Sequence, residues 1–440
     1  MAGSIFPEEL DCFVESLRPF QVVDIGSDGW LQQNQTVVKL AQQAYFEANG
    51  KHEEIIKERI LVEGKLTILV HEIHCVSVWK SKILIKLLEE PELSASFMIY
   101  SVFYYELNNL ALLELILYHK ASFEMLGDCL LDLIDYCALA IGQLIGLVNE
   151  RRSCEKSENL DTETTKEELQ RMREDIGFKI GLKCLSIFSY LTQNLQTLPL
   201  SASTRITKVH DLPCLAVEML HLKPWLRNNK GTEKFVNDRW IPHCGDEIFK
   251  LAPSEAQTWI CLYNLLLSSE TMQHYEFSEY RKREISKCIA LLNEQVLDQL
   301  PILVHLKQYL CSMQMQNVSD SKRGTGLFLE EIPELKTNLI NNAKQYGISR
   351  IVQNHKTIFV TLTQEQIFEK AKRLNDIYNT EVLEEFDNSF VPPTNFDEMC
   401  QKCKAIATKK CSKCLKVRYC SRECQVSDWP QHKEQCHQIK

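Results

Sequence analysis

The segment from 400 to 436 constrains the fold of this chain most, because eight of its residues have the types and spacings of zinc ligands. Zinc prefers four tetrahedral sulfur or nitrogen ligands, and a structural site leaves no position for water. A segment this short cannot bury enough apolar surface to fold alone, so the metal must supply the folding free energy. We therefore expect two Zn²⁺ ions per chain, held by Cys400, Cys403, Cys411, Cys414, Cys420, Cys424, His432 and Cys436.

Two arrangements of these ligands are open. In a sequential arrangement, the first four residues bind one ion and the last four bind the other. In an interleaved arrangement, the first and third pairs share one ion, and the second and fourth pairs share the other. Spacing alone does not decide between them. His432 and Cys436 are four residues apart and so share one helical face. Ser421 and Asp428 are the expected N-caps of two short helices.

This segment resembles a MYND zinc finger in the run Tyr419–Gln425 and in Asp428, Trp429, His432 and Cys436. The resemblance implies a cross-braced finger with the interleaved arrangement. It also implies binding of short proline-containing peptides, through positions that correspond to Ser412, Gln425 and Trp429. The alternative for Trp429 is a packing role, because a large aromatic ring often supplies the buried area of a small domain.

The rest of the chain is predicted to be almost wholly helical. Only 15 Gly and 13 Pro occur among 440 residues, which argues against a β-rich or disordered chain, and long runs rich in Leu and Ile favour helices. An acidic polar stretch predicts a surface loop, and a Pro-Pro pair predicts a stiff linker. We divide the chain into a helical body at 1–386 with a polar loop near 151–168, a linker at 387–399 and the finger at 400–436.

Capping patterns predict two helix starts, at Ser254 with Gln257 and at Thr363 with Gln366. In addition, a weakly similar pattern recurs at three apolar helix starts, and the last two of these are 88 residues apart, twice 44. Armadillo and HEAT repeats are about 40–47 residues long. The fold prediction is therefore an irregular armadillo- or HEAT-like α-solenoid, with an irregular helical domain as the alternative. The three starts lie at Leu66, Leu212 and Leu300.

Charge and cysteine content limit the partners and the compartment. Residues 400–440 contain ten Lys and Arg against three Asp and Glu, or +7, so the chain's total of −9 leaves −16 for residues 1–399. Such an acidic body would repel a phosphate backbone, so we expect no nucleic-acid partner. Eleven cysteines outside the finger are scattered singly, mostly in apolar runs, which is typical of reduced, buried thiols in the cytosol or nucleus. Without a run of eighteen apolar residues, we also expect no membrane insertion.

No catalytic signature is evident, and we expect the protein not to be an enzyme. His71 and His74 flank a glutamate but are three residues apart, whereas a zinc-protease helix needs them four apart. We therefore favour a helix side facing core or solvent. The adjacent His243 and Cys244 lie in a polar bend, where such neighbours are common. The Asn-His-x-Cys core of a SET methyltransferase, which accompanies some MYND fingers, is absent from the sequence.

Over nearly its whole length the chain resembles a family of MYND proteins that assemble axonemal dynein arms. The resemblance implies a cytoplasmic adaptor in ciliated cells, near the centrosome or basal body, that serves motile cilia. It implies three kinds of partner: a leucine-rich-repeat dynein assembly factor, the heat-shock chaperone machinery, and dynein chains as clients. The alternative is a nuclear corepressor adaptor. The segments that carry the resemblance are 26–30, 65–79, 210–225, 239–240, 259–268, 297–301 and the finger.

Overall fold

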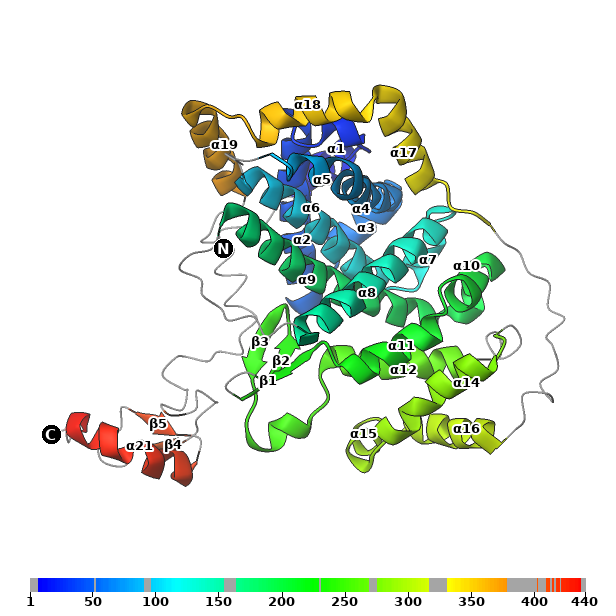
Figure 1. The fold of residues 1–440 in the computed structure, drawn as a ribbon, viewed down its shortest axis with the longest axis vertical. Helices are drawn as coiled ribbons and strands as arrows, with labels where there is room; N and C mark the ends of the chain where they lie inside the picture. The colour runs from blue at the N-terminus through cyan, green and yellow to red at the C-terminus, as the bar shows by residue number, and fades with distance from the viewer. Residues whose placement is uncertain are drawn as a thin grey trace. The chain divides into compact units, whose positions relative to one another are not determined.

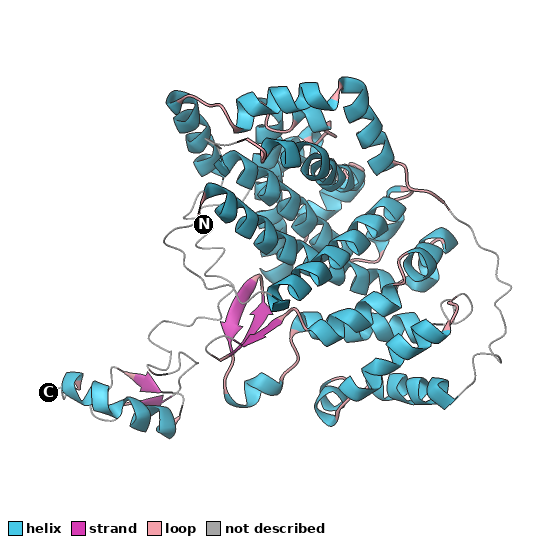
Figure 2. Cartoon of the chain, in the orientation of Figure 1, coloured by secondary structure: helices cyan, strands magenta, loops and turns pink. Residues whose placement is uncertain are grey.

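The computed structural model describes residues 7–50, 53–90, 96–153, 164–228, 231–268, 275–315 and 331–377, and in the C-terminal segment 402, 409–411, 414, 417–419 and 421–436. The described chain is mainly helical with two small sheets, which confirms the predicted class (Figures 1 and 2). It divides into two compact units, one from 1–223 with 254–379 and the other from 224–253 with 380–440. The solenoid type of the body remains a prediction.

The first unit is made of helices that come before and after residues 224–253 in the sequence. Its N-terminal part comprises α1 (Pro7–Ser16), η1 (Val22–Asp24), α2 (Asp28–Gly50), α3 (Ile55–Val62), α4 (Leu66–Trp79), η2 (Lys80–Leu84), α5 (Ile85–Leu87), α6 (Ser96–Leu117), α7 (Ala121–Glu124), α8 (Cys129–Ser153), α9 (Thr165–Gln193), η4 (Leu195–Thr197), α10 (Leu200–Thr204), η5 (Arg205–Val209) and α11 (Leu212–Leu222). Its C-terminal part comprises α12 (Pro253–Leu267), α14 (Glu279–Ser286), η7 (Lys287–Leu291), α15 (Glu294–Gln299), α16 (Leu303–Met315), α17 (Leu335–Tyr346), α18 (Ile348–Phe359) and α19 (Gln364–Ile377).

Helix α4 is central to the first unit. Its sequence is apolar on nearly every side, and such a helix is stable only when it is surrounded by others. Accordingly it packs against α6, α8 and α17, and Trp79 at its end is fully buried. The helical path continues through the π-turn η2 into α5 without leaving the right-handed helical region.

The C-terminal helices return to the N-terminal part of the same unit. Helix α18 packs against α5, α6 and η2, and Figure 1 shows it running along the top of the N-terminal helices. Gly26 lies under α18 with φ +87°, and a Cβ there would lie 2.8 Å from Ile358 Cγ2 and 2.9 Å from Phe359 Cζ. Only glycine therefore fits this close approach without strain.

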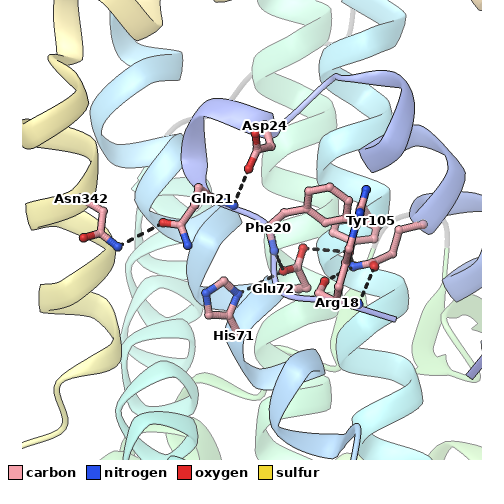
Figure 3. Close-up of polar contacts among 9 residues, drawn as sticks. Arg18, Phe20, Gln21, Asp24, His71, Glu72, Tyr105 and Asn342 are labelled. Carbon is pink, nitrogen blue, oxygen red and sulfur yellow. Dashed lines mark hydrogen bonds and ion pairs between the residues drawn. The ribbon is translucent and has the colours of Figure 1, made fainter. Parts of the chain in front are cut away.

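A buried carboxylate organises the polar contacts near α4 (Figure 3). Glu72 is 1% exposed; its Oε1 accepts from the backbone N–H of Phe20 at 2.7 Å and lies 3.1 Å from His71 Nδ1. Its Oε2 accepts from the Tyr105 hydroxyl at 2.9 Å. These bonds offset the cost of burying the carboxylate. Glu72 and His71 therefore take part in hydrogen bonds inside the helical body, as expected for a helix side that faces the core.

Helix α8 is long and apolar enough by length and composition to cross a membrane, over Cys129–Arg151. However, 67% of the most apolar 18-residue stretch of this helix is buried inside the protein. It packs against α9, α11 and α4, as the core helix of a helical body does.

Of the two predicted capping boxes, one is confirmed and one is wrong. Thr363 N–H donates to Gln366 Oε1 at 3.1 Å, and Gln366 N–H donates to Thr363 Oγ1 at 3.3 Å. By contrast, α12 begins at Pro253, whose fixed φ suits the first helical position, so Ser254 lies inside the first turn. The Gln257 side chain instead accepts from the Ser186 hydroxyl at 3.1 Å.

The second unit contains a sheet that the sequence reading missed when it treated residues 1–399 as almost wholly helical. Strands β1 (Leu226–Asn228), β2 (Thr232–Val236) and β3 (Arg239–Pro242) form an antiparallel sheet in the order β1-β2-β3, followed by the 3₁₀ turn η6 (Gly245–Phe249). Phe235 pairs with Trp240 across the β2–β3 hairpin, and their ring centroids are 5.2 Å apart. The same unit contains β4 (Lys409–Lys410), β5 (Arg418–Tyr419) and α21 (Arg422–Gln435).

Candidate metal centre

A hairpin and a helix build the C-terminal centre. Strands β4 and β5 pair antiparallel, with Lys409 opposite Tyr419, and the N–H of Cys411 donates to the carbonyl of Val417 at 2.7 Å. The Ser421 hydroxyl accepts from the N–H of Cys424 at 3.3 Å and so caps the start of α21, as predicted. The hairpin and the helix each bring ligand candidates to one place.

Four of the predicted ligands form one cluster. Cys411, Cys414, His432 and Cys436 are all buried, and their ligand atoms lie within 4.8 Å of one another. Cys411 Sγ is 3.9 Å from Cys436 Sγ, and Cys414 Sγ is 3.5 Å from His432 Nε2. These four residues are the second and fourth pairs of the sequence, which the interleaved arrangement assigns to a single ion.

The donor set fits a structural zinc. Three sulfurs and one imidazole nitrogen are typical zinc ligands, and four protein donors close a tetrahedral site. Burial and the neighbouring thiols of Cys411 and Cys414 raise the pKa of Cys436 to about 11, so without a cation this thiol keeps its proton at neutral pH. Zinc would supply the positive charge that three thiolates need, and with it folding free energy.

The other four predicted ligands are not brought together in the described structure. Cys400, Cys403 and Cys420 lie outside the described residues. Cys424 is half-buried on α21 and packs against the buried cluster of Cys411, Cys414, Tyr419 and Cys436. The first metal site, and with it a count of two zinc ions, remains a prediction.

Asp428 was expected to begin a second short helix, and this is wrong. Helix α21 continues unbroken from Arg422 through Pro430, and Asp428 lies in its interior. Its Oδ2 accepts from the Tyr419 hydroxyl at 2.7 Å. Burial and this carboxylate raise the pKa of Tyr419 well above its usual range, so the hydroxyl keeps its proton and donates it.

Of the predicted peptide contacts, Trp429 is the most informative. Its side chain is 38% exposed, with its ring 5.9 Å from that of His432. Tyr419, at 1% exposed, is the aromatic side chain that fills the small core, and the sequence reading did not single it out. Gln425 is half-buried on α21, while Ser412 lies outside the described residues.

The other histidine motifs show no metal site. His74 is buried, with Nε2 2.9 Å from the carbonyl oxygen of Asp132, and burial lowers its pKa to about 4. His243 Nδ1 lies 2.8 Å from the carbonyl oxygen of Ile241. Within the described ranges, the finger cluster is the one group of His, Cys, Asp or Glu side chains close enough to hold a metal.

Both the metal centre and the whole chain are similar in sequence to known proteins. Residues 400–436 match the MYND finger family. The chain is 38% identical over 453 residues to the zinc finger MYND domain-containing protein 10 homolog of Drosophila melanogaster, covering 99% of each chain. No solved structure matches the chain.

Other relatives share only a short stretch. Ubiquitin carboxyl-terminal hydrolase 16 of Arabidopsis thaliana is 51% identical over 39 residues, which is 9% of this chain and 4% of that protein. SET domain-containing protein 14 of Caenorhabditis elegans is 44% identical over 46 residues, which is 10% of this chain and 11% of that protein. Such coverage does not extend the activities in their names to this chain.

Proposed function

The chain belongs to the family of zinc finger MYND domain-containing protein 10, and we propose that it is a non-enzymatic cytoplasmic adaptor for preassembly of axonemal dynein arms. The family and the MYND finger support a protein-interaction role. The observation that carries this proposal is a closed cluster of four protein donors beside the exposed Trp429. A fully ligated zinc has no open position for substrate, so its contribution is to fold a docking surface.

Trp429 is the expected anchor of that surface. Its neighbours on the outward side of α21 are exposed, namely Val426 at 64% and the charged Arg422 and Lys433. Aromatic side chains that keep an apolar face accessible are enriched among the residues that dominate binding energies at interfaces. The finger therefore offers an apolar contact bordered by positive charge.

The proposed partners are a leucine-rich-repeat dynein assembly factor, the heat-shock chaperone machinery and dynein chains as clients. Support comes from the resemblance of the whole chain to its family. The same resemblance supports a location in the cytoplasm of ciliated cells, near the centrosome or basal body. The predicted linker at 387–399 lies outside the described residues. A helical body and a finger on one chain would bind one large assembly with avidity, because the second contact forms at high effective concentration.

The test is to purify the full chain from motile-ciliated cells and identify what co-purifies, comparing wild type with Trp429→Ala. Tyr280→Ala is a matched control, because Tyr280 is also an exposed aromatic (60%) but lies on α14 in the first unit. Zinc content is measured for each protein in parallel. We expect dynein chains, chaperones and assembly factors with the wild type and the control, and fewer of them with Trp429→Ala at unchanged zinc.

Two results would count against this function. Chromatin or corepressor components with the wild type would point to the nuclear alternative. Loss of zinc together with the partners in Trp429→Ala would show that Trp429 holds the finger together, and would remove the evidence for a docking surface there.

A further inference from the structure

A buried hydrogen bond links the two halves of the metal centre without involving a ligand. The Tyr419 hydroxyl donates to Asp428 Oδ2 at 2.7 Å, and the two residues are only 1% and 6% exposed. Hydrogen bonds from a neutral donor to a carboxylate are short and about twice as strong as bonds between neutral groups. Removing the donor would leave a buried carboxylate without its hydroxyl partner, which is costly.

Tyr419 lies next to a segment that carries zinc ligands, and Asp428 lies on the helix that carries His432. Tyr419 is on β5, which the Cys411–Val417 backbone bond ties to the chain carrying Cys411. Asp428 is on α21, one turn before His432, so the two side chains share a face of the helix. The hydrogen bond therefore connects the part that supplies two thiols to the helix that supplies the imidazole.

We propose that Tyr419 and Asp428 are positioning residues for the zinc of the finger, an inference that rests on the metal site of the proposed function. Their bond fixes the rotation of α21 about its axis and so aims His432 Nε2 at Cys414 Sγ, 3.5 Å away. The ring of Tyr419 also lies edge-on to that of His432, with ring centroids 6.0 Å apart.

The physical consequence is preorganisation. The four donors come from two separate parts of the finger, the hairpin and α21, which must be held against each other before zinc can bind all four. A bond that already holds the helix against the hairpin reduces the ordering that zinc binding must otherwise drive. Substitutions outside the ligand set that loosen ligand orientation typically weaken metal affinity by about 10–100-fold. We expect the lower end of this range, because the four ligands themselves remain.

The experiment measures zinc affinity of the full chain by competition with a chelator of known affinity, together with zinc per chain at saturation. Tyr419→Phe keeps the ring and removes only the hydroxyl. Asp428→Asn keeps an oxygen that accepts from the hydroxyl, whereas Asp428→Ala does not. Val426→Ala is the control, because this side chain lies on the same helix but is 64% exposed.

We expect Tyr419→Phe and Asp428→Ala to weaken zinc binding roughly tenfold at unchanged saturation, with Asp428→Asn closer to wild type. The double variant Tyr419→Phe with Asp428→Ala should bind no more weakly than Asp428→Ala, because both remove one interaction. Tyr419→Phe behaving like Val426→Ala would overturn the inference while leaving the zinc finger intact. A lower zinc content at saturation would also overturn it, since Tyr419 would then be needed for folding. Wild-type protein without zinc would instead refute the metal site itself.

Discussion

The indole N–H of Trp79 donates to Nδ1 of His355 at 2.9 Å, across 276 residues of sequence, and both side chains are fully buried. Because Nδ1 accepts this bond, the imidazole proton lies on Nε2, which faces the carbonyl of Val23 at 3.2 Å. One histidine thus connects α18 to the end of α4 and to η1 near the N-terminus. This contact is one of several between the C-terminal and N-terminal helices of the first unit, beside the packing of α17 on α4 and of α18 on α6.

Replacing His355 by alanine should destabilise the first unit by about 2–4 kcal/mol, because it leaves the buried Trp79 N–H without an acceptor and creates a cavity. Urea unfolding of the full chain, followed by near-UV absorption or fluorescence of the buried tryptophans, measures this loss. Ser349→Ala, an exposed position on the same helix, is the control and should change little. Equal stability of the two variants would show that α18 is held by other contacts.

The stability of the first unit should fall as the pH drops below 6.5. Burial lowers the pKa of His355 from 6.5 to about 4, so the unfolded chain takes up the proton before the folded one does. The stabilising contribution is therefore complete above pH 6.5, and it shrinks by about 2 kcal/mol by pH 5. Comparing urea unfolding at pH 7 and pH 5, we expect a smaller loss in His355→Gln than in wild type. Parallel losses in the two proteins would contradict this origin.

Substitution of Gly26 by alanine should destabilise the protein by about 1–3 kcal/mol, since the new methyl group meets Ile358 and Phe359 at a positive φ. Gly142→Ala is the matched control, because Gly142 lies inside α8 with open space around its Cβ position. There the same change should stabilise by about 0.5–1 kcal/mol. Thermal unfolding distinguishes the two directions, and a stable Gly26→Ala would mean that α18 can shift at no cost.

Replacing Cys411 by alanine should remove zinc from the finger, because three ligands do not close the site. Zinc per chain falls below the wild-type value, while urea unfolding of the helical body stays unchanged. Cys12→Ala is the control, since Cys12 is an exposed thiol on α1. Unchanged zinc content in Cys411→Ala would exclude Cys411 as a ligand.

Local capping patterns succeeded where the neighbouring residues alone decide the structure. The box of Thr363 with Gln366 and the cap at Ser421 depend on atoms within one helical turn. The box predicted at Ser254 failed because Pro253 takes the first helical position. Asp428 failed as a cap because its carboxylate has a tertiary partner, Tyr419, which no pattern within α21 indicates.

The β2–β3 hairpin had a signal that was overlooked. Two runs with strand-favouring residues flank Asn237 and Asp238, which both adopt positive φ, at 51° and 60°. An Asn-Asp pair between such runs is typical of a tight hairpin turn. The contact between Trp79 and His355 had no comparable signal, because it depends on how helices far apart in sequence pack.

The docking of α18 also has a consequence for protein synthesis. A ribosome that has completed α4 must add a further 276 residues before His355 exists, which at roughly 5–20 residues per second takes on the order of tens of seconds. During that interval the nascent N-terminal helices cannot bury the surface that α18 later covers. A messenger RNA with a premature stop codon before residue 348 would make that exposure permanent, and the truncated product would bind a hydrophobic dye and become a substrate for cellular quality control.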